Sequence, residues 1–194
     1  MTRGNQNARM HDIPADLTPT VIAFTLHLPF PKLEDKEKGL KASTVEDYRW
    51  LKCHIKSTSL LANILLNDQA ISEQSNTAIL LRDGYLTEGS TANVFIVDQH
   101  HSVRTPPLNH LCLPGITRQI TIELLNKLNI EVKEDPEISR DDIIRAEQVW
   151  ITSTTKEVYP VTTVDGLKIG SGQTSDLWKK VDDLYQQLVE NSDV

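Results

Sequence analysis

Cysteine is scarce in this sequence, and its scarcity argues against a fold held together by disulfides or by zinc. The 194 residues include only Cys53 and Cys112, which do not form a CxxC pair. Residues 1–15 contain no apolar core followed by a small-residue cleavage site, so no secretory signal is visible. Because disulfides persist mainly in secreted proteins, we expect two reduced thiols and a cytoplasmic protein.

Long apolar runs and clustered positive charge are also missing. The most apolar early stretch, Val21 to Phe30, has ten residues and is interrupted by His27 and Pro29, so it is too short to span a bilayer. The net charge is −7, and the lysines and arginines are scattered among acids, whereas a surface that binds nucleic acid needs clustered basic residues. We therefore expect neither a membrane nor a nucleic acid as a partner.

The residues that are present have the composition of a globular protein, with 39% hydrophobic and 24% charged residues. Periodicity and turn residues predict a mixture of strands and helices. The strands are expected at 18–28, 39–46, 77–81, 85–87, 93–97, 102–105, 131–134, 148–153 and 157–164, and the helices at 59–74, 116–128, 139–146 and 175–190. Because hairpins are mixed with helices and strands do not alternate strictly with helices, the order predicts an α+β fold with a largely antiparallel sheet.

Two local patterns refine this prediction. Ser57 or Ser59 is expected to cap the helix at 59–74, and Ser139 the helix at 139–146, because serine side chains accept hydrogen bonds from the first free N–H groups of a helix. The charge run from Lys32 to Lys38 follows two prolines and is expected to be a solvated linker.

Four segments hold the residues on which a functional hypothesis depends. They are Asp47–Ser57, which contains Lys56; Leu86–Phe95, which contains Glu88; Leu113–Arg118; and Ile151–Glu157. In order and spacing they resemble the motifs of class IV (fold-type IV) aminotransferases, which depend on pyridoxal 5'-phosphate (PLP), and among these the D-amino-acid transaminases. Four motifs in one order are stronger evidence than any single motif.

The resemblance implies the large C-terminal domain of the D-amino-acid aminotransferase-like fold, an α+β domain with mostly antiparallel strands and flanking helices. It divides the chain into a remnant of the N-terminal small domain at 1–30, an interdomain linker at 31–40 and a PLP-binding large domain at 41–194. Family members begin with a small domain that supplies a phosphate-binding arginine and a tyrosine of the substrate pocket. Since no segment before Thr2 carries these residues, we expect a truncated chain, and a degenerate non-catalytic remnant or a chain completed by another polypeptide are the alternatives.

The resemblance implies that Lys56 carries the cofactor as a Schiff base. The pyridoxal aldehyde condenses with a neutral amine, and an apolar, partly enclosed site disfavours the charged form of a lysine. The same amine, once freed, can move a proton at the substrate's α-carbon. The resemblance assigns Glu88 to the pyridine nitrogen, whose protonation an adjacent carboxylate favours. A surface lysine and an exposed hairpin glutamate are the alternative interpretations.

The phosphate of the cofactor is a dianion, which is best held by the free N–H groups at the start of a helix. The resemblance places the cofactor contacts at Gly115, Ile116 and Thr117 of such a start, at Ser153 and Thr154 of a turn, and at Leu113 against the ring. Ordinary capping by serine and threonine, and a core leucine, are the alternatives.

Arg9 and His11 resemble the arginine and histidine by which D-amino-acid transaminases hold the substrate carboxylate. The planar fork of an arginine bonds a carboxylate in two places. One extra residue separates this pair from Arg3-Gly4, and a polar N-terminus without such a role is the alternative.

The function implied by the resemblance is PLP-dependent transamination of D-amino acids such as D-alanine with 2-oxo acids, in a homodimer. The activity of a truncated chain is left open. An aminodeoxychorismate lyase and a branched-chain aminotransferase are alternatives within the same fold. A non-catalytic PLP-binding or interaction domain is an alternative of another class.

Overall fold

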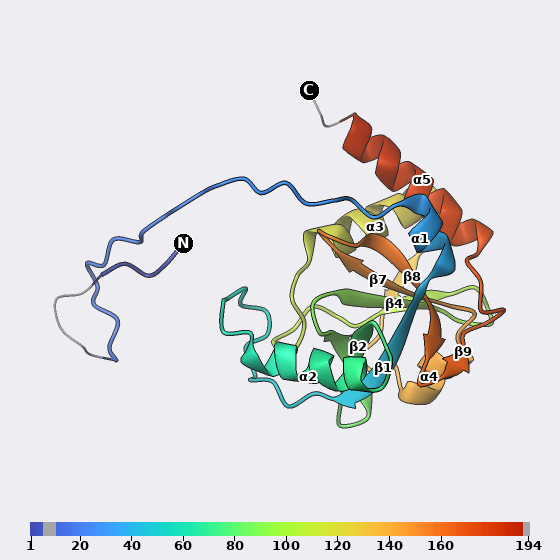
Figure 1. Cartoon of the computed structure of the whole chain (residues 1–194), viewed down its shortest axis with the longest axis horizontal. Coiled ribbons are helices and arrows are strands. Elements are labelled where there is room, and N and C mark those ends of the chain that lie inside the picture. Colours follow the sequence, from blue (N-terminus) through green and yellow to red (C-terminus); the bar gives the residue numbers. More distant parts are fainter. Residues whose placement is uncertain (6–10, 192–194) are drawn as a thin grey trace.

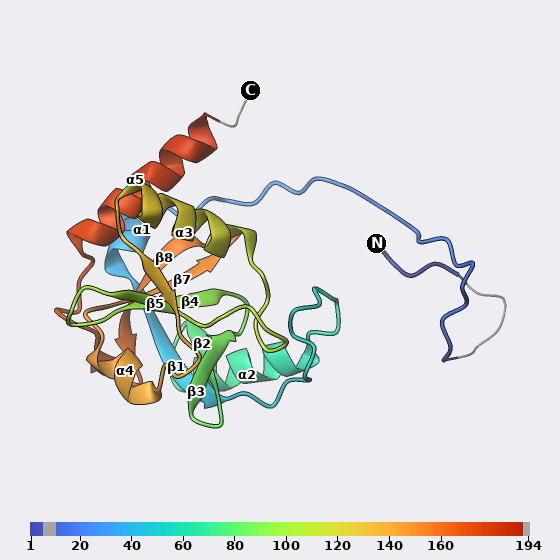
Figure 2. The same cartoon turned by 180° about the vertical axis from the view of Figure 1, so that it is seen from behind.

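The computed structural model describes residues 1–5 and 11–191. Residues 1–5 and 11–31 form an arm that extends away from the body, and both views show it clear of the sheet (Figure 1, Figure 2). The remaining described residues form a curled sheet with helices packed against it. In the described part of the chain, no helix is long and apolar enough to cross a membrane.

The elements of the described residues follow the chain in an order that mixes hairpins with helices. The helices are α1 (Leu33–Lys38), α2 (Leu61–Ser72), α3 (Ile116–Lys127), α4 (Arg140–Arg145) and α5 (Asp176–Glu190). The strands are β1 (Leu40–Glu46), β2 (Thr77–Arg82), β3 (Tyr85–Gly89), β4 (Asn93–Val97), β5 (Val103–Thr105), β6 (Val132–Glu134), β7 (Gln148–Ser153), β8 (Glu157–Val164) and β9 (Leu167–Lys168).

One sheet contains all of these strands, in the order β3-β2-β1-β8-β7-β4-β5-β6, with β9 paired to β8. β1 is parallel to β2 and to β8, and β5 is parallel to β6. The other pairings are antiparallel. The α+β prediction with a mostly antiparallel sheet is therefore confirmed.

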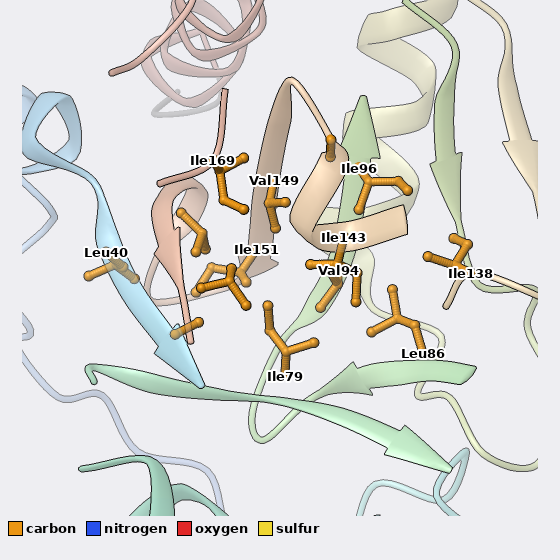
Figure 3. Packing of buried hydrophobic residues seen from close by; sticks show 14 of the residues in the cluster. Leu40, Ile79, Leu86, Val94, Ile96, Ile138, Ile143, Val149, Ile151 and Ile169 are labelled. Atoms are coloured by element: carbon orange, nitrogen blue, oxygen red, sulfur yellow. The ribbon is translucent and has the colours of Figure 1, made fainter. Parts of the chain in front are cut away.

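The alternation of side chains along each strand divides the core into separate clusters, because successive residues point to opposite faces. Val149 and Ile151 of β7 point into the curl of the sheet, together with Val94 and Ile96 of β4 and Ile143 of α4. Figure 3 shows these side chains pointing toward one another. This cluster fixes the strands that lead to the candidate site.

The opposite face of the sheet is covered by helices. Phe95 and Trp150, which alternate with the residues inside the curl, pack against α3 and α5 through a cluster that includes Leu125 and Trp178. α2 covers a third cluster, in which Leu66 packs against β1 and β2. The Trp178 indole N–H donates to the Val158 carbonyl at 3.1 Å, so this large side chain is buried without an unpaired donor.

Several local predictions are confirmed at residue level. β7 and β8 have the expected bounds, and Asp83 and Gly84 form the tight turn between β2 and β3. Ser139 caps α4 and, with Asp142, forms a capping box. The caps expected for α2 are wrong: the helix begins after Leu60 and has no side-chain cap.

The strand expected at residues 18–28 is also wrong. Only Thr20 makes a β-bridge, to Thr2, and every residue from 21 to 30 is exposed. Phe24 and Leu26 are 76% and 71% exposed although they follow the alternation of a strand. A strand needs a neighbour whose backbone groups complete its hydrogen bonds, and no described residue provides one beyond residue 20.

The linker predicted to be solvated contains a buried lysine, which corrects that prediction at one residue. Lys36 of α1 is 1% exposed, and its ammonium group donates to Glu157 and, at 2.7 Å, to Asp182. Lys38, two residues later, remains on the surface and pairs with Asp35 at 2.8 Å. Lys36 therefore ties α1 to the start of β8 and to α5.

Candidate active site

A buried network of charges lies where the segment after β1 meets β3. The Arg49 guanidinium donates hydrogen bonds to both carboxylate oxygens of Asp47 from Nε and Nη2, each at 2.9 Å, and its Nη1 donates to Glu88. Arg82 pairs with Asp47 at 3.2 Å, and the Thr87 hydroxyl donates to the same carboxylate at 2.8 Å. Two of the four predicted motif segments are joined by these contacts.

Glu88 is the member of this network predicted from sequence to contact the cofactor. It is buried, with 5% of its surface exposed, which excludes the interpretation as an exposed hairpin glutamate. Burial raises the pKa of the Glu88 carboxyl, and the charge and hydrogen bond of Arg49 oppose this shift. At Asp47 the balance is reversed: burial would raise the pKa, but the bonds and charge of Arg49 lower it to about 2.

The third motif segment is attached directly to Glu88. The backbone N–H of Leu113 donates to Glu88 Oε2 at 2.9 Å. The Leu113 carbonyl in turn accepts from the Asn93 side-chain amide at 2.8 Å. Leu113 is half-buried. The two hydrogen bonds fix its backbone on both sides of the α-carbon.

Gly115 packs closely against Asn93 at the start of α3, a place called the glycine cradle below. A Cβ at this position would lie 2.2 Å from Asn93 Oδ1, closer than a real side chain can approach. Gly115 precedes the first residue of α3, whose initial N–H groups have no partner within the helix. A phosphate fits this arrangement, because those N–H groups point at an approaching anion.

The fourth segment lies beside this cradle through the strand register. Asn93 of β4 pairs with Thr152 of β7, and Ser153 is the next residue along β7. The Thr152 hydroxyl is buried and has no hydrogen-bond partner among the described residues. Ser153 is half-buried and accepts from the Lys156 N–H at 3.2 Å, while Thr154 is exposed at the tip of the turn. Hydroxyl groups of this kind suit a phosphate that needs several donors.

Lys56 lies in the irregular segment between β1 and α2, and its side chain is exposed. The Cys53 N–H donates to the His110 carbonyl at 2.8 Å, which ties this segment to the loop that precedes Leu113. At the other end, Asn63 of α2 donates to the Ser90 carbonyl at 2.7 Å, two residues after Glu88. The prediction of an enclosed environment for Lys56 is therefore wrong, because the described residues leave its side chain exposed to solvent.

The remaining predicted residues have different surroundings. Thr117 is buried, whereas Ile116 is 70% exposed. His11 is exposed and belongs to the arm, which extends away from the body that contains the other predicted residues. Arg9 lies outside the described residues.

Sequence reasoning assigned no role to Arg49 or Asn93, although both lie inside the motif segments. Arg49 holds Glu88, and Asn93 links Leu113, Gly115 and β7. In the sequence, the only indication for Arg49 is an aspartate two residues earlier, Asp47, with which it could pair. That spacing indicates nothing about Glu88. Only the contact across 39 residues reveals it.

The fold of this chain is similar to those of solved aminotransferases. Solved structures with a similar fold include the branched-chain amino acid aminotransferase of Escherichia coli, 29% identical, with a TM-score of 0.69 over 78% of this chain and 52% of that one. The branched-chain aminotransferase of Thermoproteus uzoniensis, solved with norvaline, is 27% identical, with a TM-score of 0.73 over 86% and 56% of the two chains. The fold is thus one on which aminotransferases are built.

A family model described as amino-transferase class IV matches residues 1–164, and the chain belongs to this family of PLP-dependent enzymes. It is 41% identical to the D-alanine aminotransferase of Bacillus licheniformis over 97% of this chain and 65% of that protein. It is 38% identical to a D-alanine aminotransferase of Listeria monocytogenes over 98% and 64% of the two chains. The chain therefore spans about 65% of the length of the curated relatives it matches.

Proposed function

We propose that this protein transfers the amino group of a D-amino acid, such as D-alanine, to a 2-oxo acid, with PLP held on Lys56. The observation that carries the proposal is the buried Glu88 carboxylate, joined through Leu113 to the glycine cradle at the start of α3. A buried carboxylate beside an anion cradle suits a cofactor with a pyridine ring and a phosphate. The naming of two relatives as D-alanine aminotransferases supports the choice of substrate.

Each proposed residue has a separate task. When bound, PLP supplies the electron sink that stabilises negative charge at the substrate's α-carbon. The Lys56 amine anchors the cofactor and then moves the proton at that carbon. Glu88 holds a proton on the pyridine nitrogen. Gly115, Ile116, Thr117, Ser153 and Thr154 would hold the phosphate, and Leu113 would lie against the ring.

The substrate carboxylate is assigned to Arg9 and His11, as the sequence suggests. His11 lies on the arm, so this role requires the arm to lie against the Lys56 segment. Arginine would supply two parallel hydrogen bonds to the carboxylate, which fixes the orientation of the α-carbon.

A second candidate is transamination of branched-chain L-amino acids, and the likeness to two branched-chain aminotransferase structures favours it. The two enzymes act on substrates that have opposite configurations at the α-carbon. The fold alone does not separate them, because branched-chain aminotransferases match its structure and D-alanine aminotransferases match its sequence. Substrate preference therefore decides between these candidates.

The test is a paired assay of the full chain loaded with PLP. With 2-oxoglutarate as acceptor, D-alanine is expected to yield pyruvate faster than L-leucine yields its oxo acid. Faster turnover of L-leucine would replace the D-specific proposal with the branched-chain one. Cofactor binding without turnover of either substrate would favour a non-catalytic PLP-binding domain, and a failure to bind PLP would refute both enzyme proposals.

We also propose a cytoplasmic homodimer, with a small-domain remnant at 1–30, a linker at 31–40 and a PLP-binding domain at 41–194. Exposed apolar side chains beside Lys56 support a subunit contact there: Tyr48, Trp50, Leu51, Ile55, Leu61, Ile64 and Leu65. Sedimentation of the full chain at micromolar concentration is expected to give twice the chain mass. A single species at 21.9 kDa would contradict the dimer.

A further inference from the structure

Arg49 is the only described residue whose side chain bonds both carboxylates of the buried network. It is 5% exposed, Asp47 is 3% exposed and Glu88 is 5% exposed. Charges this far from water are stable only when they are paired. With Arg82 included, the network contains two positive and two negative groups, and therefore balances when all four are charged.

The two carboxylates depend on Arg49 to different degrees. Asp47 keeps the Arg82 ion pair and the Thr87 hydroxyl when Arg49 is removed. Glu88 then has only the N–H of Leu113, a neutral donor, as a hydrogen-bond partner among the described residues. A carboxyl buried beside a neutral amide favours its protonated form, because burial penalises the charge. Loss of Arg49 therefore places a proton on Glu88 and leaves Asp47 ionised.

We infer that Arg49 is a positioning residue that keeps Glu88 ionised and fixed beside Leu113. Its contact with Oε1 and the Leu113 N–H contact with Oε2 hold both oxygens of the carboxyl. The consequence for the cofactor rests on the proposed function: an ionised Glu88 favours a proton on the pyridine nitrogen, and a neutral one does not. Arg49 would thus control the cofactor without touching it.

Infrared difference spectroscopy of the full chain tests the charge of Glu88 directly, without cofactor. In Arg49→Met at neutral pH, a protonated-carboxyl stretch is expected that the wild type lacks. The same band should vanish when Glu88→Gln is added, which assigns it to this residue. In Arg49→Lys, where a positive charge remains within reach of Glu88, the band is expected to be weak or absent.

Arg82→Gln is the matched control, because Arg82 pairs with Asp47 but forms no hydrogen bond or ion pair with Glu88 in the described structure. This variant loses a partly buried arginine of the same network and is expected to show no Glu88 band. An ionised Glu88 in Arg49→Met, or an equal band in Arg82→Gln, would overturn the inference. Circular dichroism of each variant establishes that the comparison is made on folded protein.

The cofactor part is read from the nitrogen-15 chemical shift of the pyridine nitrogen of added, labelled PLP as a function of pH. In the wild type the protonated-ring form is expected to persist to higher pH than in Arg49→Met, with Arg82→Gln close to wild type. Absence of PLP binding by the wild type would refute the proposed function and leave the infrared result to decide the role of Arg49. An unchanged titration in Arg49→Met, with a Glu88 band present, would overturn the proposed control of the ring proton by Arg49. Its effect on the charge of Glu88 would stand.

Discussion

Replacement of Lys36 by methionine is expected to lower the free energy of unfolding by about 3–5 kcal/mol, the usual cost of breaking a buried ion pair from one side. Methionine retains most of the apolar stem, so the change isolates the charge. Glu157 and Asp182 would be left buried, each with 3% of its surface exposed and without the ammonium group. Urea unfolding of wild type and variant measures the difference.

The loss should depend on pH in a direction fixed by the carboxyls. Burial raises the pKa of Asp182, and Lys36 opposes that shift, so removing Lys36 raises the pKa further. A group whose pKa is raised in the folded state stabilises the fold below its ordinary pKa, and that contribution is lost as the pH rises through the folded value. The deficit of Lys36→Met is therefore smallest in acid and grows toward neutral pH.

Lys38→Met is the matched control, because Lys38 lies on the same short helix but pairs with Asp35 at the surface. It is expected to change stability little, since exposed ion pairs are screened by solvent. Adding Glu157→Gln and Asp182→Asn to Lys36→Met should recover part of the loss by removing the unpaired charges. Equal destabilisation by the two lysine variants would refute a specific role of the buried cluster.

Replacement of Lys56 by alanine is expected to slow transamination by about 10²–10⁴-fold, the range for removing a general acid–base group. Borohydride reduction of the PLP-loaded wild type is expected to give a permanent adduct, which peptide mass analysis should place on Lys56. The substitution should abolish this adduct. Both losses follow from one amine acting as anchor and as proton carrier. Rates are compared with D-alanine as donor and 2-oxoglutarate as acceptor.

Lys52→Ala provides the control, because Lys52 is also exposed and lies four residues earlier in the same segment. It should retain both the adduct and the rate. A small primary amine added to Lys56→Ala is expected to restore part of the proton transfer, which a misfolded variant would not allow. Full activity in Lys56→Ala, or an adduct on Lys52, would remove Lys56 from the proposed mechanism.

Local signals in the sequence were sufficient for much of the fold. The bounds of β7 and β8 followed from runs of branched and aromatic residues, and Ser139 announced the start of α4 through its capping pattern. These features depend on neighbours within a few residues, so a single chain displays them. The prediction of a strand at residues 18–28 was wrong because it also used local pattern alone. These residues have the alternation of a strand but no partner strand in the described structure.

The candidate site was predictable as a set of segments but not as an arrangement. The four motifs placed Lys56, Glu88, Gly115 and Thr154 in one hypothesis, and the family match agrees with the resemblance. Burial could not be read in the same way. Glu88 proved buried and Lys56 exposed, because exposure depends on which distant segments cover a side chain.

The sequence by itself determined the family, most of the strands and helices from residue 40 onward and the segments that could hold PLP, because these depend on residue type and spacing along the chain. Only the tertiary structure decided that Arg49 holds Glu88 and that Lys36 is buried. The partners of Lys36 lie 121 and 146 residues away. A pairing at that separation leaves no local pattern, since it exists only when folding closes the intervening chain.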